Sequence, residues 1–192
     1  MKLREHTIWL CGEHVLLRPM TEYDWGILLR WNSDPELLYY SEGDDVQSYS
    51  LEEIQGIYRG VSQAAFCFIA EVDSQPIGEG WLQKMNLQRI LQQYPGQDCR
   101  RIDLMIGEKA WWGKGIGSEM IRLLTKFAFE QENADLVFGV GIADYNPRSL
   151  KAFQKVGFQI VETIEQPPGN KARYGYDVLL TRDHYETLRL RP

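Results

Sequence analysis

The chain has 192 residues, long enough for one well-buried domain and short for two, so we expect a single domain spanning residues 1–192. Its composition, 44% hydrophobic and 25% charged, is that of a globular protein and not of a disordered or fibrous one. Twenty-seven acidic against 21 basic residues give a net charge of -6, which argues against nucleic acid as a partner and suits either a cationic substrate or simple solubility.

The N-terminal region predicts a hairpin followed by helices. Residues 7–10 and 13–18 alternate apolar and polar side chains around a turn that contains Gly12, which is the pattern of two paired strands. Two helix starts follow, because a Ser or Thr three residues before an acid has the spacing of a capping box. The two pairs are Thr21 with Asp24 and Ser50 with Glu53. We expect the first helix to end near residue 35.

The middle of the chain predicts a loop and then a strand pair. Residues 37–49 are rich in tyrosine and acid and predict a loop, which is either a substrate lid or an ordinary connection. Two apolar, β-rich runs at 65–72 and 76–85 predict adjacent strands joined by a short turn. Residues 86–100 give no clear signal.

The C-terminal half alternates strands with helices. The expected strands are 101–106, 136–140, 158–165 and 173–180, and the expected helices follow the glycines near 115, begin at Asn146-Pro147, and span 182–190. This order predicts a mixed α/β fold with helices on both faces of a central sheet.

The segment WWGKGIG, residues 111–117, joins the strand 101–106 to an amphipathic helix. Its glycines let the main chain bend sharply and approach a ligand closely, and the unpaired N–H groups of the helix's first turn favour an anion. The spacing fits neither a Walker loop nor a dinucleotide fingerprint. We therefore predict pyrophosphate binding, the alternative being that the glycines serve only a tight turn.

Two segments resemble the GNAT superfamily of N-acetyltransferases. The run WWGKGIGSEMI resembles its coenzyme A pyrophosphate loop, [QR]-x-x-G-x-[GA], with Trp112 in place of Gln or Arg. The run NPRSLKAFQKVGF resembles its later segment N-x-x-[SA]-x-x-x-[YF]-x-K-x-G-F. The resemblance implies the GNAT fold, a central twisted mixed and mostly antiparallel sheet. In this fold the strand that holds Asp103 splays from the strand 136–140, and the gap takes the pantetheine arm of acetyl-coenzyme A (acetyl-CoA).

The resemblance also implies which residues bind acetyl-CoA. They are Met105, Ile106, Trp112, Gly113, Lys114, Gly115, Ile116, Gly117, Ser118, Asn146 and Phe153. Main-chain N–H groups around Met105 and Ile106 would hold the thioester carbonyl. Tryptophan at position 112 removes one polar contact of the family pattern, and Asn146 before a proline is equally an ordinary helix N-cap.

Two carboxylates are candidates for the base that deprotonates the amine. Asp103 is the first, because the strand RIDLMI resembles the strand of aminoglycoside 6'-N-acetyltransferases in which an aspartate is placed as the base. An ordinary aspartate is a weak base, so Asp103 could mainly bind the ammonium, or it could be a satisfied carboxylate at a strand end. Glu79 in PIGEGWLQ is the second, with a solvent-facing position as the alternative.

The leaving thiolate raises a separate question. Many relatives place a tyrosine as general acid at the position of Phe153, and phenylalanine has no proton to give. Either Tyr145 takes this role or the thiolate leaves unprotonated. Phe153 would then pack beside the thioester arm or in the core.

The segments RPMTEYD and RYGYDVLLTRDHYETLR resemble the aminoglycoside 6'-N-acetyltransferase branch more than the spermidine or histone branches. The resemblance implies an enzyme that acetylates a polycationic small-molecule amine and a role in antibiotic resistance. Attraction of the amine would come from Asp103, Asp144, Glu79, Tyr40 and the acidic segment 42–45. The alternatives are a ribosomal-protein or peptide N-terminal acetyltransferase and an acetyl-CoA-binding module with weak catalysis.

Further partners are limited by what the sequence lacks. Cys11, Cys67 and Cys99 are widely spaced and form neither a disulfide framework nor a zinc motif, and no run approaches the ~18 apolar residues of a membrane span. We expect a cytoplasmic monomer or homodimer with no metal, no membrane partner and no nucleic-acid partner.

Overall fold

The computed structural model of the chain describes residues 1–42 and 46–190. The strands in these ranges are β1 (Leu10–Cys11), β2 (Leu16–Pro19), β3 (Ala65–Val72), β4 (Gln75–Lys84), β5 (Cys99–Met105), β6 (Leu136–Ala143), β7 (Gln159–Glu165) and β8 (Tyr174–Thr181). The α-helices are α1 (Trp25–Trp31), α2 (Pro35–Ser41), α3 (Leu51–Val61), α4 (Gln88–Gln93), α5 (Ile116–Glu130), α6 (Pro147–Val156) and α7 (Arg182–Arg189).

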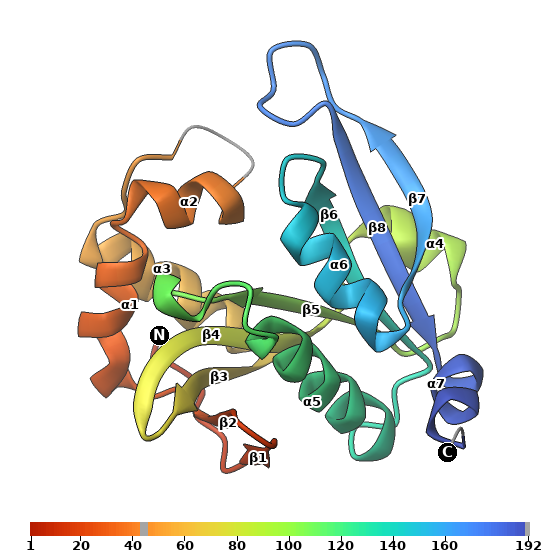
Figure 1. Cartoon of the computed structure of the whole chain (residues 1–192), viewed down its shortest axis with the longest axis horizontal. Coiled ribbons are helices and arrows are strands. Elements are labelled where there is room, and N and C mark those ends of the chain that lie inside the picture. The colour runs from red at the N-terminus through yellow and green to blue at the C-terminus, as the bar shows by residue number, and fades with distance from the viewer. Residues whose placement is uncertain (43–45, 191–192) are drawn as a thin grey trace.

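The strands form one continuous sheet (Figure 1). Over the described ranges it has eight strands in the order β1-β2-β3-β4-β5-β6-β8-β7. Neighbouring strands in this order are antiparallel except β5 and β6, which are parallel and are connected through α5. The predicted mixed, mostly antiparallel sheet is therefore confirmed.

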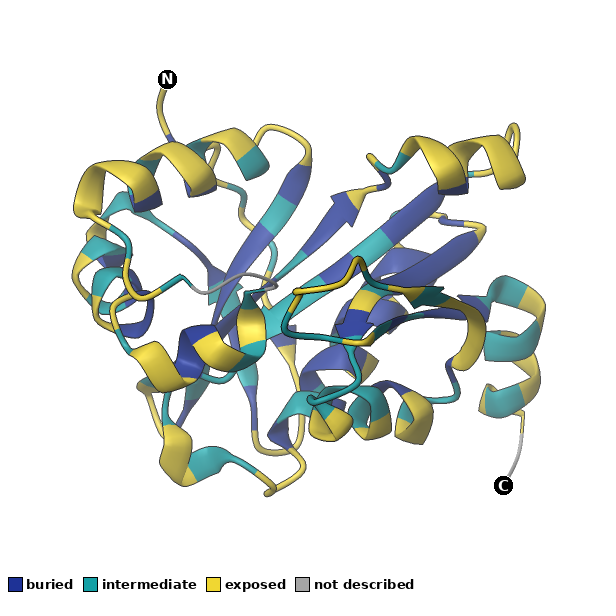
Figure 2. Ribbon diagram, turned by 90° about the horizontal axis from the view of Figure 1, so that it is seen from above, coloured by how far each residue is buried: buried dark blue, intermediate teal, exposed yellow. Residues whose placement is uncertain are grey.

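Helices cover both faces of the sheet, as expected. On β3, Phe68 packs into the core beneath α5, whereas its neighbour Ile69 packs into the core beneath α1, α2 and α3. Ile90 of α4 packs against β6 and β8 on the other side from α6. Figure 1 shows α5 and α6 in front of the sheet and α4 behind it, and Figure 2 shows that buried residues concentrate in the strands between these layers.

Two local expectations were wrong. The loop predicted over 37–49 begins inside α2, because α1 ends at Trp31 and Asp34 with Pro35 starts a new helix. The Asp34 carboxylate accepts from the Glu36 and Leu37 N–H groups at 2.9 and 3.3 Å, and Pro35 occupies the first turn. The first predicted strand, 7–10, shrinks to the two residues of β1. Residues 43–45 of the predicted acidic segment lie outside the described residues, so only Glu42 of that segment is placed.

The strands β5 and β6 diverge, and this opens the centre of the sheet. They pair at only three positions, the last being Arg101 with Phe138. Beyond that point β6 bulges between Gly139 and Ile142 where it faces β8. Phe153 of α6 fills the space behind the bulge, since a Cβ at Gly139 would lie 2.7 Å from the Phe153 ring. The predicted splay of the Asp103 strand from β6 is confirmed.

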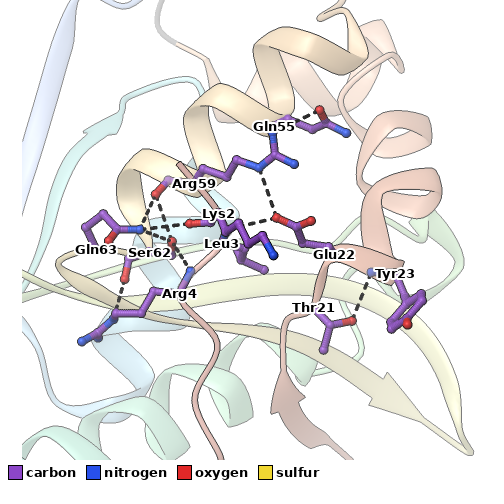
Figure 3. A network of polar contacts seen from close by, with 10 residues as sticks. All are labelled: Lys2, Leu3, Arg4, Thr21, Glu22, Tyr23, Gln55, Arg59, Ser62 and Gln63. Carbon is purple, nitrogen blue, oxygen red and sulfur yellow. Dashed lines mark hydrogen bonds and ion pairs between the residues drawn. The ribbon is translucent and has the colours of Figure 1, made fainter.

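The N-terminal segment fixes α3 from outside (Figure 3). The Glu22 carboxylate accepts from the Leu3 N–H at 3.1 Å and from Arg59 of α3 at 3.2 Å. Ser62, at the end of α3, accepts from the Arg4 N–H at 3.0 Å through its hydroxyl and from the Arg4 side chain at 2.9 Å through its carbonyl. Residues distant in sequence thus hold α3 in place against β3 and β4.

Candidate functional site

A cavity of about 420 Å³ lies between the end of β5 and α6, beside the glycine turn. We call it the glycine-turn cavity. It contains nine of the residues predicted to bind acetyl-CoA: Met105, Ile106, Trp112, Gly113, Gly115, Ile116, Gly117, Ser118 and Asn146. Two predicted residues are not in its lining. Lys114 lies with its ammonium 4.9 Å from the centre of the Trp111 ring, and Phe153 is buried in the core.

The glycines of the turn differ in backbone conformation and in the space around them. Gly113 and Gly115 have φ of 74° and 87°, a left-handed conformation that strains any residue with a Cβ. Gly115 is the N-cap of α5 and no side chain caps this helix end. Gly117 is helical, and a Cβ there would find only ordinary contacts with Leu104 and Ala152. The first-turn N–H groups of α5 have no partner within the helix, so they can bind an anion in the cavity.

Three cations of α6 line the same cavity, and sequence reasoning missed them. Arg148, Lys151 and Lys155 follow the spacing i, i+3, i+7 and therefore share one helix face. The Arg148 guanidinium lies 4.1 Å from the Trp112 ring centre and 4.5 Å from that of Tyr40. Trp112 in turn donates from Nε1 to the Ile106 carbonyl at 2.8 Å. The tryptophan that replaces the family's polar residue thus holds an arginine at this position.

A second cavity, of about 410 Å³, adjoins the first. We call it the carboxylate cavity, because Glu42, Glu79 and Asp103 are in its lining. Six residues line both cavities: Tyr40, Ser41, Leu104, Met105, Asn146 and Ser149. The two cavities therefore meet at the end of β5, directly after Asp103.

Asp103 is already paired. Its carboxylate accepts from Arg101 at 2.8 Å (Nε) and 2.5 Å (Nη2) and from the Trp81 indole N–H at 2.8 Å. Trp81 is its register partner on β4. A quarter of the Asp103 side chain is exposed. Arg101 and Trp81 thus fix the position of the Asp103 carboxylate, and both of its oxygens already accept hydrogen bonds.

Glu79 has a different environment. It is buried, with 5% of its surface exposed, so the solvent-facing alternative is excluded. Burial, with smaller contributions from the Asp103 and Glu42 charges, raises the pKa of Glu79 to about 8, while a hydrogen bond from Tyr58 acts in the opposite direction. The Tyr58 hydroxyl donates to Oε1 at 3.1 Å. Among the described residues, Oε2 has no hydrogen-bond partner.

Of the remaining predicted residues, some line the cavities and one lies outside both. Tyr145 lines the carboxylate cavity and donates its hydroxyl to the Glu42 carbonyl at 3.2 Å. Asn146 caps α6 through Ser149 N–H at 3.2 Å and donates to the Tyr40 carbonyl at 3.2 Å, so it is both an N-cap and part of the site. Asp144 does not line either cavity; its carboxylate accepts from the Tyr174 N–H at 3.2 Å.

No group of three or more His, Cys, Asp and Glu side chains in residues 1–42 and 46–190 is arranged to hold a metal ion. In the same ranges no helix has both the length and the apolar composition needed to cross a membrane.

A strand, a glycine turn and an uncapped helix start beside the diverging β5–β6 pair form a site suited to an anionic ligand, and comparison with known families identifies the class of enzyme. Residues 14–159 match the family model described as "Acetyltransferase (GNAT) domain". The chain therefore belongs to the GNAT acetyltransferase family and is an acetyl-CoA-dependent N-acetyltransferase.

The individual relatives have low sequence identity to this chain. "Aminoglycoside N(6')-acetyltransferase type 1" from Klebsiella pneumoniae is 23% identical over 172 residues, which cover 82% of this chain and 80% of that protein. The structure of AAC(6')-Ib with ribostamycin and coenzyme A has a TM-score of 0.78 at 22% identity, covering 94% of this chain and 99% of that one. Spermidine N-acetyltransferase from Vibrio cholerae, with coenzyme A and spermine, has a TM-score of 0.74 at 17% identity, covering 91% and 99%. At these identities the structural likeness shows the fold.

Proposed function

We propose that this enzyme acetylates a primary amine of a polycationic small molecule, of the aminoglycoside 6'-amino type, and that such activity would confer antibiotic resistance. The observation that carries the proposal is the carboxylate cavity, which adjoins the glycine-turn cavity and has Glu42 and Asp103, together with the buried Glu79, in its lining. Support also comes from the relatives in the Klebsiella pneumoniae and AAC(6')-Ib comparisons, whose names or ligands are aminoglycoside-related.

We assign acetyl-CoA to the glycine-turn cavity. The first turn of α5 with Gly113 and Gly115 fits the pyrophosphate, and Arg148 with Lys151 adds positive charge for phosphate groups. The thioester would lie at the end of β5, where the cavities meet and where main-chain N–H groups near Met105 can polarise its carbonyl. Acetyl-CoA supplies the activated acetyl group.

Within the carboxylate cavity we reverse the order of the two sequence candidates. Glu79 is the base, because a carboxylate whose pKa is about 8 takes protons near neutral pH. Asp103 binds the ammonium, because its carboxylate lines the same cavity and Arg101 and Trp81 fix its position there. Tyr145 remains the candidate for protonating the thiolate, since it lines the cavity and Phe153 carries no proton.

Thiol release with acetyl-CoA and kanamycin tests this assignment. Glu79→Gln is expected to lower kcat about a hundredfold or more, the usual contribution of a general base. Asp103→Asn is expected to raise KM for the amine with a smaller loss of kcat. If Asp103→Asn abolishes turnover while Glu79→Gln leaves it unchanged, the assignment is wrong.

The acceptor class is tested with a panel of kanamycin, spermidine and a peptide with a free N-terminus. The proposal requires the highest kcat/KM on kanamycin. Turnover of the peptide alone would indicate an N-terminal acetyltransferase instead. Calorimetric binding of acetyl-CoA without thiol release on any amine would indicate a binding module.

A further inference from the structure

Three buried side chains form a hydrogen-bonded series from α1 through α3 to β4. Asn32, directly after α1, donates from Nδ2 to the Tyr58 hydroxyl at 3.2 Å, and Tyr58 of α3 donates to Glu79 Oε1 at 3.1 Å. Asn32, Tyr58 and Glu79 are 9%, 3% and 5% exposed. Polar groups this buried stabilise the fold only when their hydrogen bonds are made, so the series has a defined geometry.

The direction of every hydrogen bond in the series follows from one backbone carbonyl. Asn32 Nδ2 also donates to the Leu28 carbonyl at 2.9 Å, and a carbonyl can only accept. The atom facing Tyr58 is therefore the amide nitrogen, which can only donate. The Tyr58 oxygen accepts from it, so the Tyr58 hydroxyl proton is directed at Glu79. Oε1 of Glu79 is thereby occupied as an acceptor.

The other carboxylate oxygen is left without a partner. Among the described residues, Glu79 Oε2 is a buried atom with no hydrogen bond, and Glu79 lines the carboxylate cavity. A buried oxygen without a hydrogen-bond partner destabilises the fold, so its presence calls for a functional explanation. α3 itself is fixed from outside by the Glu22–Arg59 and Arg4–Ser62 contacts of Figure 3, so Tyr58 cannot easily turn away.

We propose that Asn32 and Tyr58 are positioning residues that reserve Glu79 Oε1 as a hydrogen-bond acceptor and leave Oε2 as the atom that takes the proton of the substrate ammonium. This inference rests on the proposed role of Glu79 as base. Asn32 and Tyr58 both line the carboxylate cavity, and the function assigned to them is exerted through Glu79: they select one of two otherwise equivalent oxygens.

The proton and electron balance of the step is as follows. The ammonium gives one proton to Oε2, and the freed nitrogen lone pair forms the N–C bond to the thioester carbonyl carbon. The C–S bond breaks and its electron pair remains on sulfur. The second proton that nitrogen loses neutralises the thiolate, and the proton on Oε2 is released to solvent before the next turnover.

Several charged or titratable groups face Glu79. They are Tyr58 on α3, Cys67 on β3, Asp103 with its partner Arg101 on β5, and Glu42 after α2. Of these, the Tyr58 hydrogen bond lowers the pKa of Glu79, whereas the Asp103 and Glu42 charges raise it. Loss of the Tyr58 hydroxyl therefore moves the pKa of Glu79 upward.

Tyr58→Phe tests the proposal through the pH profile of kcat. In the wild type we expect kcat to rise with pH through the pKa of Glu79, and we call this rise the ascending limb of the profile. In Tyr58→Phe we expect this limb to move about one pH unit higher, which lowers kcat about tenfold at pH 7, with KM for the amine unchanged. Asn32→Asp is the second variant. It places an acceptor where Tyr58 now meets a donor, draws the hydroxyl proton away from Glu79, and is expected to move the limb in the same direction.

Tyr185→Phe is a matched control, because Tyr185 donates its hydroxyl to Glu130 at 2.7 Å on the α5–α7 side of the molecule. It is expected to leave the profile unchanged, and thermal unfolding of all variants confirms that they fold. If Tyr58→Phe and Asn32→Asp keep the wild-type limb while Glu79→Gln loses it, the positioning role is refuted and Glu79 remains the base. If Glu79→Gln keeps both turnover and the limb, the proposed base itself is wrong.

Discussion

Glu79 and Asp103 line one cavity and carry the same functional group, yet their surroundings differ. Asp103 is partly exposed and accepts hydrogen bonds from the Arg101 guanidinium and the Trp81 indole N–H. Glu79 is buried beside negative charge, and both factors raise its pKa. The base that we propose is therefore the carboxylate whose pKa is raised towards neutral pH.

The raised pKa of Glu79 lowers the free energy of unfolding at pH values above the ordinary pKa of 4.5. The pKa of Glu79 is about 8 in the folded chain against an ordinary value of 4.5, so between these pH values the unfolded chain releases a proton that the folded chain keeps. The free energy of unfolding therefore falls as pH rises from 4.5 towards 8 and levels off above that range.

Glu79→Gln is accordingly expected to raise the unfolding temperature at pH 8 and to leave it unchanged near pH 4.5. About 1 kcal/mol corresponds to roughly 2–4 °C in a chain of this size, so a gain of several degrees is measurable by calorimetry. Glu165→Gln, at an exposed position on β7, serves as the control and should show no such pH dependence. A gain that is equal at both pH values would contradict the pKa assigned to Glu79.

At the scale of the element, the turn from η2 (Lys109–Trp111) into α5 combines conformational and steric requirements. Gly115→Ala places a Cβ on a residue with φ of 87°, which costs about 1–2 kcal/mol. We expect it to lower both the unfolding temperature and the affinity for acetyl-CoA. Gly117→Ala introduces no such strain, but its Cβ would enter the space between Leu104 and Ala152, which we assign to the cofactor.

Gly117→Ala is therefore expected to weaken acetyl-CoA binding about tenfold while leaving the unfolding temperature of the free enzyme unchanged. Calorimetric Kd values and unfolding temperatures of the two alanine variants separate the two effects. If both variants lower the unfolding temperature equally, Gly117 is needed for the conformation of the turn and not for space around the cofactor.

The elements that the sequence predicted correctly are those whose signals are local. Capping boxes at Thr21 and Ser50 and the glycine that ends α6 need only a few neighbouring residues. α2 was missed because Asp34-Pro35 was interpreted only as the end of the preceding helix, whereas α1 ends at Trp31 and Asp34-Pro35 starts the next helix. α4 was missed because its N-cap position, Leu87, has no capping side chain.

The site was predictable to the same extent. The glycine turn was found from its own pattern, and Asp103 and Glu79 were selected through the resemblance to acetyltransferases; both carboxylates line the carboxylate cavity. The ranking of the two carboxylates was not predictable, because it depends on Tyr58 and Arg101, and Tyr58 lies 21 residues from Glu79 on another element. Strand alternation placed Glu79 on one face of β4, but only the packing of α3 decides that this face is covered.

At the scale of the whole molecule, opposite charges are separated across the end of β5. Glu42, Glu79 and Asp103 line one cavity, where Arg101 pairs with Asp103, and the cations of α6 line the other, although the chain as a whole has a net charge of -6. The cofactor, which is an anion, would thus be attracted to the α6 side of this junction, and the cationic acceptor that we propose would be attracted to the other side.

Charge reversal tests whether this separation is local. Lys151→Glu on α6 is expected to raise KM for acetyl-CoA about threefold to tenfold, because exposed ion pairs contribute about 0.2–1 kcal/mol each and reversal also adds repulsion. KM for the amine should stay constant. The increase should shrink as salt is raised from about 50 to 300 mM, since the Debye length is about 10 Å at 0.1 M. Lys126→Glu, an exposed change of the same size on α5 outside both cavity linings, is the control. If Lys126→Glu raises KM for acetyl-CoA as much as Lys151→Glu does, the cofactor responds to the net charge of the molecule and not to the cations of α6.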